Sequence, residues 1–175
     1  MPDSLCGKVS LVIGNEAADA DSCISALLWA FHLSLSSDTS TLVFPVVSCA
    51  AKDLVLRREF TFLLSQSLDM SGESVESTHD ALSAFLICSD AVLNALPWLE
   101  LLIQRRKLAV ILTDHNKICT EFAVLGEAVA AIVDHHFDMG AHEVSINEYV
   151  LLLLSLRLLH SRFEASPCSH CSLCK

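Results

Sequence analysis

The chain has 175 residues, of which 53% are hydrophobic, and its mean hydropathy is +0.51. That length is typical of one domain with a substantial core, and the composition argues against disorder. Lys and Arg number 11 against 21 Asp and Glu, a net charge of −10 that argues against a nucleic-acid backbone as partner. An acidic protein that handles phosphates must bring positive charge of its own, and a bound metal ion can supply it.

The N-terminal segment does not read as a secretory signal, because it has no basic start and its first apolar run stops at Gly14. No run of about 18 apolar residues is uninterrupted, so we expect no membrane-spanning helix. Five cysteines stand at no regular spacing, which is typical of reduced thiols and predicts a cytoplasmic or nuclear location. They are Cys6, Cys23, Cys49, Cys88 and Cys119.

The first apolar run, residues 9–13, predicts a buried strand that Gly14 closes. After a polar loop, apolar residues at helical spacing predict a helix over residues 23–35. Asp21 and Ser22 are suitable N-cap residues for that helix. Residues 41–47 predict a second strand, in which Pro45 indicates an irregular or edge position.

The same alternation continues through the middle of the chain. Strands are predicted at residues 84–88, 108–112 and 130–133, and helices at 54–68, 91–106 and 120–128, with a surface loop at 69–80. We expect Pro97 to kink or split the helix that contains it. Strands that alternate with helices predict an α/β fold: a doubly wound, mainly five-stranded parallel sheet with helices on both faces.

Polar side chains follow three of the predicted strands. Asn15, Asp19 and Asp21 follow the first strand; Asp114, His115 and Asn116 follow the fourth; and Asp134, His135 and His136 follow the fifth. Ligands of such sheets bind beyond the carboxyl ends of the strands. We therefore expect the three clusters to converge in space.

Each cluster alone also has a structural explanation. Asp-rich turns commonly cap helices, as Asp21 or Ser22 could here, and adjacent histidines occur on surfaces by chance. A carboxylate directly after an apolar strand, however, is costly unless it is paired or coordinated. Carboxylates with one or two imidazoles suit Mn²⁺ or Mg²⁺, and less specifically Co²⁺ or Zn²⁺. Together the clusters favour a two-metal site in which Asp114, from the middle cluster, is the natural bridge.

The three motifs are Asn-Glu-Ala-x-Asp-x-Asp-Ser from Asn15, Asp-His-Asn from Asp114 and Asp-His-His from Asp134. In this order they resemble the DHH phosphoesterase superfamily, and the Asn-Glu-Ala form resembles its prune and exopolyphosphatase branch. The resemblance covers roughly residues 9–140.

The resemblance implies a role for each polar residue. Asp19 would ligate one metal ion, Asp21 the other, and Asp114 would bridge both. His136 would be a further ligand, and His135 would face the substrate phosphate and act in catalysis with Asp114. Asn15 would take a ligand or substrate position, His115 and Asn116 would lie against the substrate, and Asp134 would orient the histidines.

By the same resemblance, the substrate would be pyrophosphate, a short polyphosphate or a nucleotide, hydrolysed with Mn²⁺ or Mg²⁺. The family's fourth motif, a further metal-binding Asp, and its basic C-terminal domain have no counterpart in this sequence. We therefore predict an incomplete DHH-type domain over residues 1–147 and a divergent apolar, cysteine-rich tail over residues 148–175. The tail's three cysteines and His170 could bind zinc, or the tail could be an alternative or aberrant end.

Two functions stay open. The first is a metal-dependent phosphohydrolase of the exopolyphosphatase or pyrophosphatase type. The second is a catalytically impaired, truncated isoform that regulates by binding a protein partner.

Overall fold

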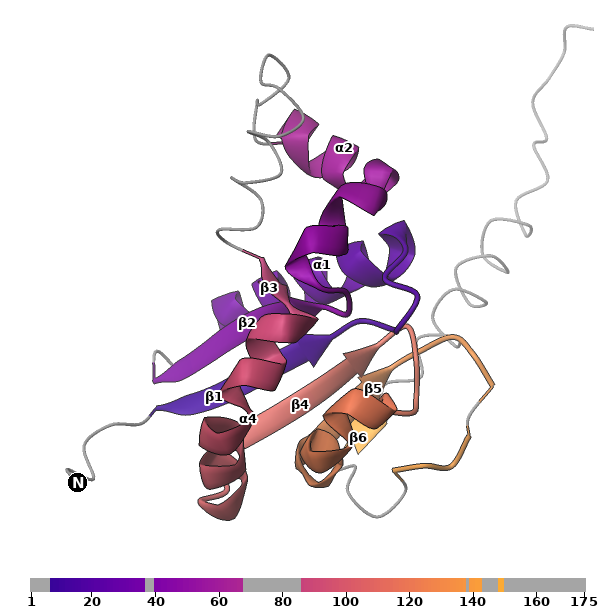
Figure 1. Cartoon of the computed structure of the whole chain (residues 1–175). Helices are drawn as coiled ribbons and strands as arrows, with labels where there is room; N and C mark the ends of the chain where they lie inside the picture. The colour runs from indigo at the N-terminus through magenta and orange to yellow at the C-terminus, as the bar shows by residue number, and fades with distance from the viewer. Residues whose placement is uncertain (1–6, 37–39, 68–85, 138, 143–147, 150–175) are drawn as a thin grey trace, which may run out of the picture.

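A computed structural model describes residues 7–36, 40–67, 86–137, 139–142 and, as backbone only, 148–149. Within these residues, six strands form one parallel sheet in the order β3-β2-β1-β4-β5-β6 (Figure 1). The strands are β1 (Lys8–Ile13), β2 (Thr41–Val47), β3 (Ile87–Cys88), β4 (Leu108–Thr113), β5 (Val129–Val133) and β6 (Glu148–Tyr149). The predicted α/β fold with its parallel sheet is confirmed, and β6 adds a short sixth strand that was not predicted.

Helices cover both faces of the sheet (Figure 1). The α-helices are α1 (Ala20–Ser36), α2 (Arg58–Ser67) and α4 (Ser89–Gln104), and two 3₁₀ helices are η1 (Ala51–Leu56) and η2 (Thr120–Ala128). Successive strand side chains point to opposite faces, which divides the core in two. Val12 and Ile111 pack with Ala26 and Ala30 of α1. The larger cluster on the other face joins alternate residues of β1 and β4 to α4 and η2.

The sheet changes its winding direction between β1 and β4. The chain runs outward from β1 through β2 to β3, then returns to place β4 on the other side of β1. The loops that follow β1 and β4 therefore diverge to opposite sides and leave an opening at the carboxyl ends of these two strands. Open α/β sheets bind ligands at such a switch point.

Two predictions about the helices are wrong in detail, and of the two outcomes expected at Pro97 the split does not occur. The helix expected at 54–68 is divided into η1 and α2, because the backbone of Arg57 leaves helical geometry. The helix expected at 120–128 is a 3₁₀ helix with a non-helical residue, Phe122, inside it. Pro97 does not split α4, which runs through it; buried Val92 and Leu99 on either side anchor the helix to the core and offset the lost hydrogen bond.

Pro45 lies in a strand that is bordered on both sides, so the predicted edge position needs correction. β2 lies between β1 and β3, but β3 pairs only with Val46 and Val47. The carbonyl of Val46 accepts a hydrogen bond from Gly14 on the β1 side. Since backbone groups of successive strand residues alternate sides, Pro45 faces the β3 side, beyond the end of that short strand. Its missing N–H therefore interrupts no pairing seen in the described residues.

The loop predicted at 69–80 and residues 150–175 of the predicted tail lie outside the described residues. The domain boundary after residue 147 stays a prediction. Among the described helices, none has both the length and the apolar character needed to cross a bilayer.

Leu125 of η2 is fully buried in the larger core cluster, whereas Leu101 on α4 is 48% exposed. We predict that Leu125→Ala lowers the free energy of unfolding by roughly 2–5 kcal/mol, because it removes buried apolar contacts and leaves a cavity. The same truncation at Leu101 should cost less than about 1 kcal/mol. Urea unfolding followed by circular dichroism measures both, and equal losses would contradict the assigned core.

Candidate metal centre

Asp114 lies where β4 ends and is the central residue of the candidate site. Its backbone N–H donates to the carbonyl of Val133 at 2.9 Å, which continues the pairing of β4 with β5. Its φ of 62° is in the left-handed region, which few residues other than glycine adopt and which is frequent at functional sites. The chain therefore turns sharply away after the strand, while the residue itself stays buried, with only 6% of its surface exposed.

Asn15 joins the loop after β1 to this carboxylate. Its side-chain amide donates to Oδ2 of Asp114 at 2.6 Å, and its Oδ1 accepts from the N–H of Ala18 at 3.2 Å. Its own N–H donates to the buried Ser22 hydroxyl at 2.6 Å. A Cβ on Gly14 would lie 2.4 Å from that hydroxyl, so glycine is needed where the loop passes α1 so closely.

The third cluster meets Asp114 from the end of β5. The Nδ1 atoms of His135 and His136 lie 3.5 and 3.8 Å from Oδ1 of Asp114. The two imidazole rings stack with their centroids 4.3 Å apart, and both are more than half exposed. Nδ1 of His136 also bonds to Oδ1 of Asp134 at 2.7 Å, so Nε2 is the ring nitrogen that this bond does not use.

Asp134 is held on both of its carboxylate oxygens. Oδ1 also accepts from the backbone N–H of His136, and Oδ2 accepts from the Asn116 amide at 2.6 Å. Burial opposes ionisation of Asp134, but these hydrogen bonds outweigh it and lower its pKa. The same contact with Asp134 raises the pKa of His136. Asp134 thus has the contacts of a residue that orients an imidazole.

Negative charge accumulates around Asp114. Burial raises the pKa of Asp114, and Asp21 and Asp19 raise it further, while the two histidines act in the opposite direction. A buried carboxylate beside two others is unfavourable without a compensating cation. The arrangement is therefore suited to bind positive charge.

Asp19 and Asp21 lie at the start of α1 and are both exposed. Oδ1 of Asp19 accepts the N–H of Ser22 at 3.0 Å, so Asp19 caps the helix. The prediction that Asp21 or Ser22 is the cap is wrong, because α1 begins at Ala20, earlier than the apolar pattern indicated. Asp21 stands in the first turn and acts on the site through its charge.

The side chains of the other two predicted residues, His115 and Asn116, form hydrogen bonds to other groups of the protein. Nδ1 of His115 donates to the carbonyl of Thr113 at 2.9 Å, and burial lowers the pKa of its half-buried ring. Asn116 is buried; besides Asp134, its amide bonds to the carbonyl of Phe137, and its Oδ1 accepts from Met139. Asn116 therefore fixes the loop after β5, and substrate contact by either residue stays a prediction.

Four of these side chains can offer ligand atoms to one ion. One atom from each of Asp114, Asp134, His135 and His136 lies within 4.8 Å of all the others. Carboxylate oxygens combined with imidazole nitrogens suit Mn²⁺, Zn²⁺ or Co²⁺, and with added water also Mg²⁺. The donor set and the charge around Asp114 both fit a divalent cation.

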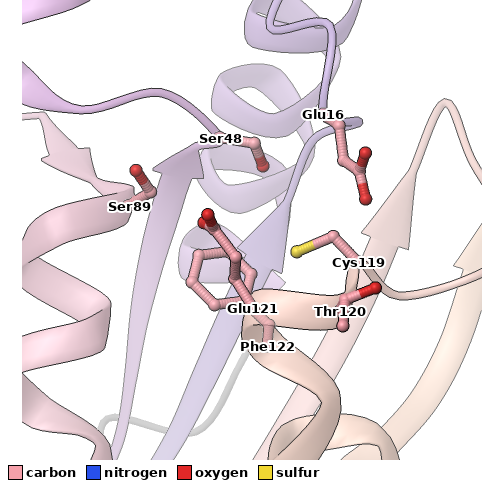
Figure 2. Close-up of a pocket in the computed structure, with 7 residues that line it drawn as sticks. All are labelled: Glu16, Ser48, Ser89, Cys119, Thr120, Glu121 and Phe122. Atoms are coloured by element: carbon pink, nitrogen blue, oxygen red, sulfur yellow. The ribbon is translucent and has the colours of Figure 1, made fainter.

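A cavity of about 340 Å³ opens at the same end of the sheet, and its lining was not recognised from the sequence (Figure 2). It is lined by Glu16, Ser48, Ser89, Cys119, Thr120, Glu121 and Phe122. Its two glutamates are exposed, and none of the lining residues that the structure describes is cationic. Glu16 belongs to the first motif, which could have indicated it; the other six lining residues stand outside the three motifs.

Comparison with known proteins shows which proteins this chain is similar to in sequence. The chain is 34% identical over 125 residues to the rat protein named Exopolyphosphatase PRUNE1, and 31% identical over 125 residues to the human one. Each match covers 71% of this chain. The chain is a relative of the prune exopolyphosphatases. The predicted resemblance to the prune branch is thereby confirmed.

A fission yeast protein, named Putative exopolyphosphatase, is 28% identical over 134 residues, or 75% of this chain. The chain spans 24% of the length of the rat and human prune proteins and 29% of the yeast protein. No protein-family model matches it.

We predict that Asp114→Asn removes the stabilisation that Mn²⁺ gives to the fold, because the central carboxylate loses its charge. Thermal unfolding with and without Mn²⁺ measures this stabilisation, since a ligand that binds the folded state raises Tm. Glu100→Gln removes one exposed carboxylate from α4 and is the matched control. An equal Mn²⁺ response in both variants would contradict a site at Asp114.

We further predict that Asn116→Ala weakens Mn²⁺ binding about 10–100-fold, because Asp134 loses the partner that holds it against His136. Isothermal titration calorimetry measures the affinity. Asn94→Ala, on the exposed side of α4, should leave it unchanged. If the two variants bind alike, Asn116 has no part in shaping the centre.

Proposed function

We propose that this chain carries the catalytic centre of a metal-dependent phosphohydrolase that cleaves phosphoanhydride bonds in pyrophosphate or short polyphosphate. The observation that carries the proposal is the meeting of the ends of β1, β4 and β5 at the buried carboxylate of Asp114. The prune relatives, which are named exopolyphosphatases, support the reaction class. We also propose a cytoplasmic or nuclear location, in keeping with the free thiols of the described cysteines.

In this proposal the cation is Mn²⁺ or Mg²⁺, and it supplies a Lewis acid for a phosphoryl oxygen and for the attacking water. Asp114 would contact both ions of a two-metal centre, with Asp19 and Asp21 on either side and His136 as a further ligand. His135 would donate to a phosphate oxygen. Its stacked position over His136 and its exposure leave it accessible to a substrate.

The chain's own residues contribute orientation and charge. Asn15 holds Oδ2 of Asp114, which leaves Oδ1 on the side of the two histidines. Asp134 fixes the ring of His136 through Nδ1. These bonds keep the donor groups in place before any ligand arrives, which reduces the ordering cost of binding a cation or a phosphate.

The alternative function is a binding or regulatory protein with an impaired centre. Two observations favour it. The four-residue donor group found in the described residues includes neither Asp19 nor Asp21, and Asp19 uses one oxygen to cap α1. Among the described residues that line the adjoining cavity, none is a cation that could hold a polyanion.

Phosphate release from pyrophosphate and tripolyphosphate, measured on the purified 175-residue chain with Mn²⁺, tests the proposal. We expect activity above the blank in the wild type and in Glu100→Gln, and a loss of at least about 100-fold in Asp114→Asn. Chelator should abolish the activity, and added Mn²⁺ should restore it.

A folded, Mn²⁺-binding chain that releases no phosphate would refute the phosphohydrolase proposal for this chain and favour the alternative. Activity that persists in Asp114→Asn would place the chemistry elsewhere or reveal a contaminating enzyme.

A further inference from the structure

Two thiols that the candidate metal centre does not use meet at the ends of β2 and β3. Cys88 is the last residue of β3, and Cys49 lies two residues beyond β2. The N–H of Ser89 donates to the carbonyl of Cys49 at 2.9 Å, which holds the two segments together. The thiols of Cys49 and Cys88 lie close enough for each to shift the pKa of the other.

A guanidinium group adds positive charge to this pair. Arg57, at the break between η1 and α2, also lies near Cys49, and its charge lowers the pKa of that thiol. In the described part of the chain its Nε is buried without a partner, and no carboxylate makes an ion pair with it. A half-buried cation favours a thiolate beside it.

The two sulfurs differ in character because of these contacts. The neighbouring Cys88 thiol and the charge of Arg57 lower the pKa of Cys49 to about 7, although burial opposes this. The pKa of Cys88 is raised by the neighbouring Cys49 and by the burial of its own side chain. One sulfur is thus suited to attack as a thiolate, and its neighbour keeps a proton and can react second.

We propose that Cys49 and Cys88 form an oxidation site for hydroperoxides, with Cys49 as the attacking sulfur, Arg57 as its charge partner and Cys88 as the resolving thiol. This inference is independent of the proposed phosphohydrolase. Both sulfurs are buried, but the adjacent Ser48 and Ser89 line the cavity of about 340 Å³, so the cavity lies within one residue of the pair (Figure 2).

The chemistry balances in two steps. The Cys49 thiolate attacks one oxygen of hydrogen peroxide, the O–O bond breaks, and hydroxide leaves, so that sulfur loses two electrons and becomes a sulfenic acid. The Cys88 sulfur then attacks that sulfur, the S–O bond breaks, and the departing hydroxide takes the Cys88 proton as water. Two thiols and one peroxide therefore give one disulfide and two waters.

The test is reaction of the full chain with hydrogen peroxide in the presence of chelator, followed by peptide mass spectrometry with dimedone as the trap for sulfenic acid. We expect a Cys49–Cys88 disulfide, and modification of Cys49 about tenfold faster than that of Cys119. Cys119 is a suitable internal reference, since it is half-buried and burial raises its pKa.

Three variants separate the roles. Cys88→Ser should leave Cys49 trapped as its dimedone adduct without a disulfide, and Arg57→Gln should slow the modification of Cys49 severalfold. Cys23→Ala alters a buried thiol of the same core and is the matched control, expected to leave both products unchanged. Circular dichroism verifies that each variant is folded.

The internal comparison needs no variant. If Cys49 in the wild-type chain reacts no faster than Cys119, the proposal is wrong. A disulfide that joins Cys49 to a cysteine other than Cys88, or a yield as high in guanidinium-unfolded protein as in the native chain, would equally overturn it.

Discussion

The hydrogen bond from the amide of Asn15 to the carboxylate of Asp114 joins the two loops that diverge at the switch point of the sheet. Most features of the candidate centre depend on it. It requires Gly14 to pass close to Ser22, a left-handed backbone at Asp114, and an Asn15 side chain fixed by Ala18. With one carboxylate oxygen held on the β1 side, the other meets the histidines that follow β5.

The free-energy cost of burying the charged carboxylate of Asp114 explains why the centre is suited to bind a cation. Asp114 is buried, and Asp21 and Asp19 act on it with further negative charge. The hydrogen bonds of Asn15 and the neighbouring imidazoles offset only part of the cost. A divalent cation would offset the rest, in keeping with the negative charge that Asp19 and Asp21 add around Asp114.

Much of this could be predicted from the sequence. Short β-branched runs between amphipathic segments indicated the parallel sheet, and the polar residues directly after the runs indicated where it binds. The order of the three motifs along the chain indicated the prune branch. Roles that depend on where a side chain points could not be predicted in this way. The sequence does not indicate that the Asn116 amide bonds to Asp134, or that Asp19 caps α1.

The other errors have a common cause, since local propensity was outweighed by tertiary packing. Pro97 is accepted within α4 because buried residues on both sides bind the helix to the core, and Pro45 is accepted within β2 because β3 is only two residues long. The thiol pair was missed because Cys49 and Cys88 lie far apart in sequence, and only the pairing of β2 with β3 brings them together.

The most direct test of the central claim is an anomalous difference map from crystals of the chain grown with Mn²⁺. We predict a peak about 2.0–2.3 Å from a carboxylate oxygen of Asp114 and from an imidazole nitrogen of His135 or His136. A peak held instead by Glu16 and Glu121 in the adjoining cavity, or ordered Asp114 and histidine side chains with no Mn²⁺ beside them, would contradict it.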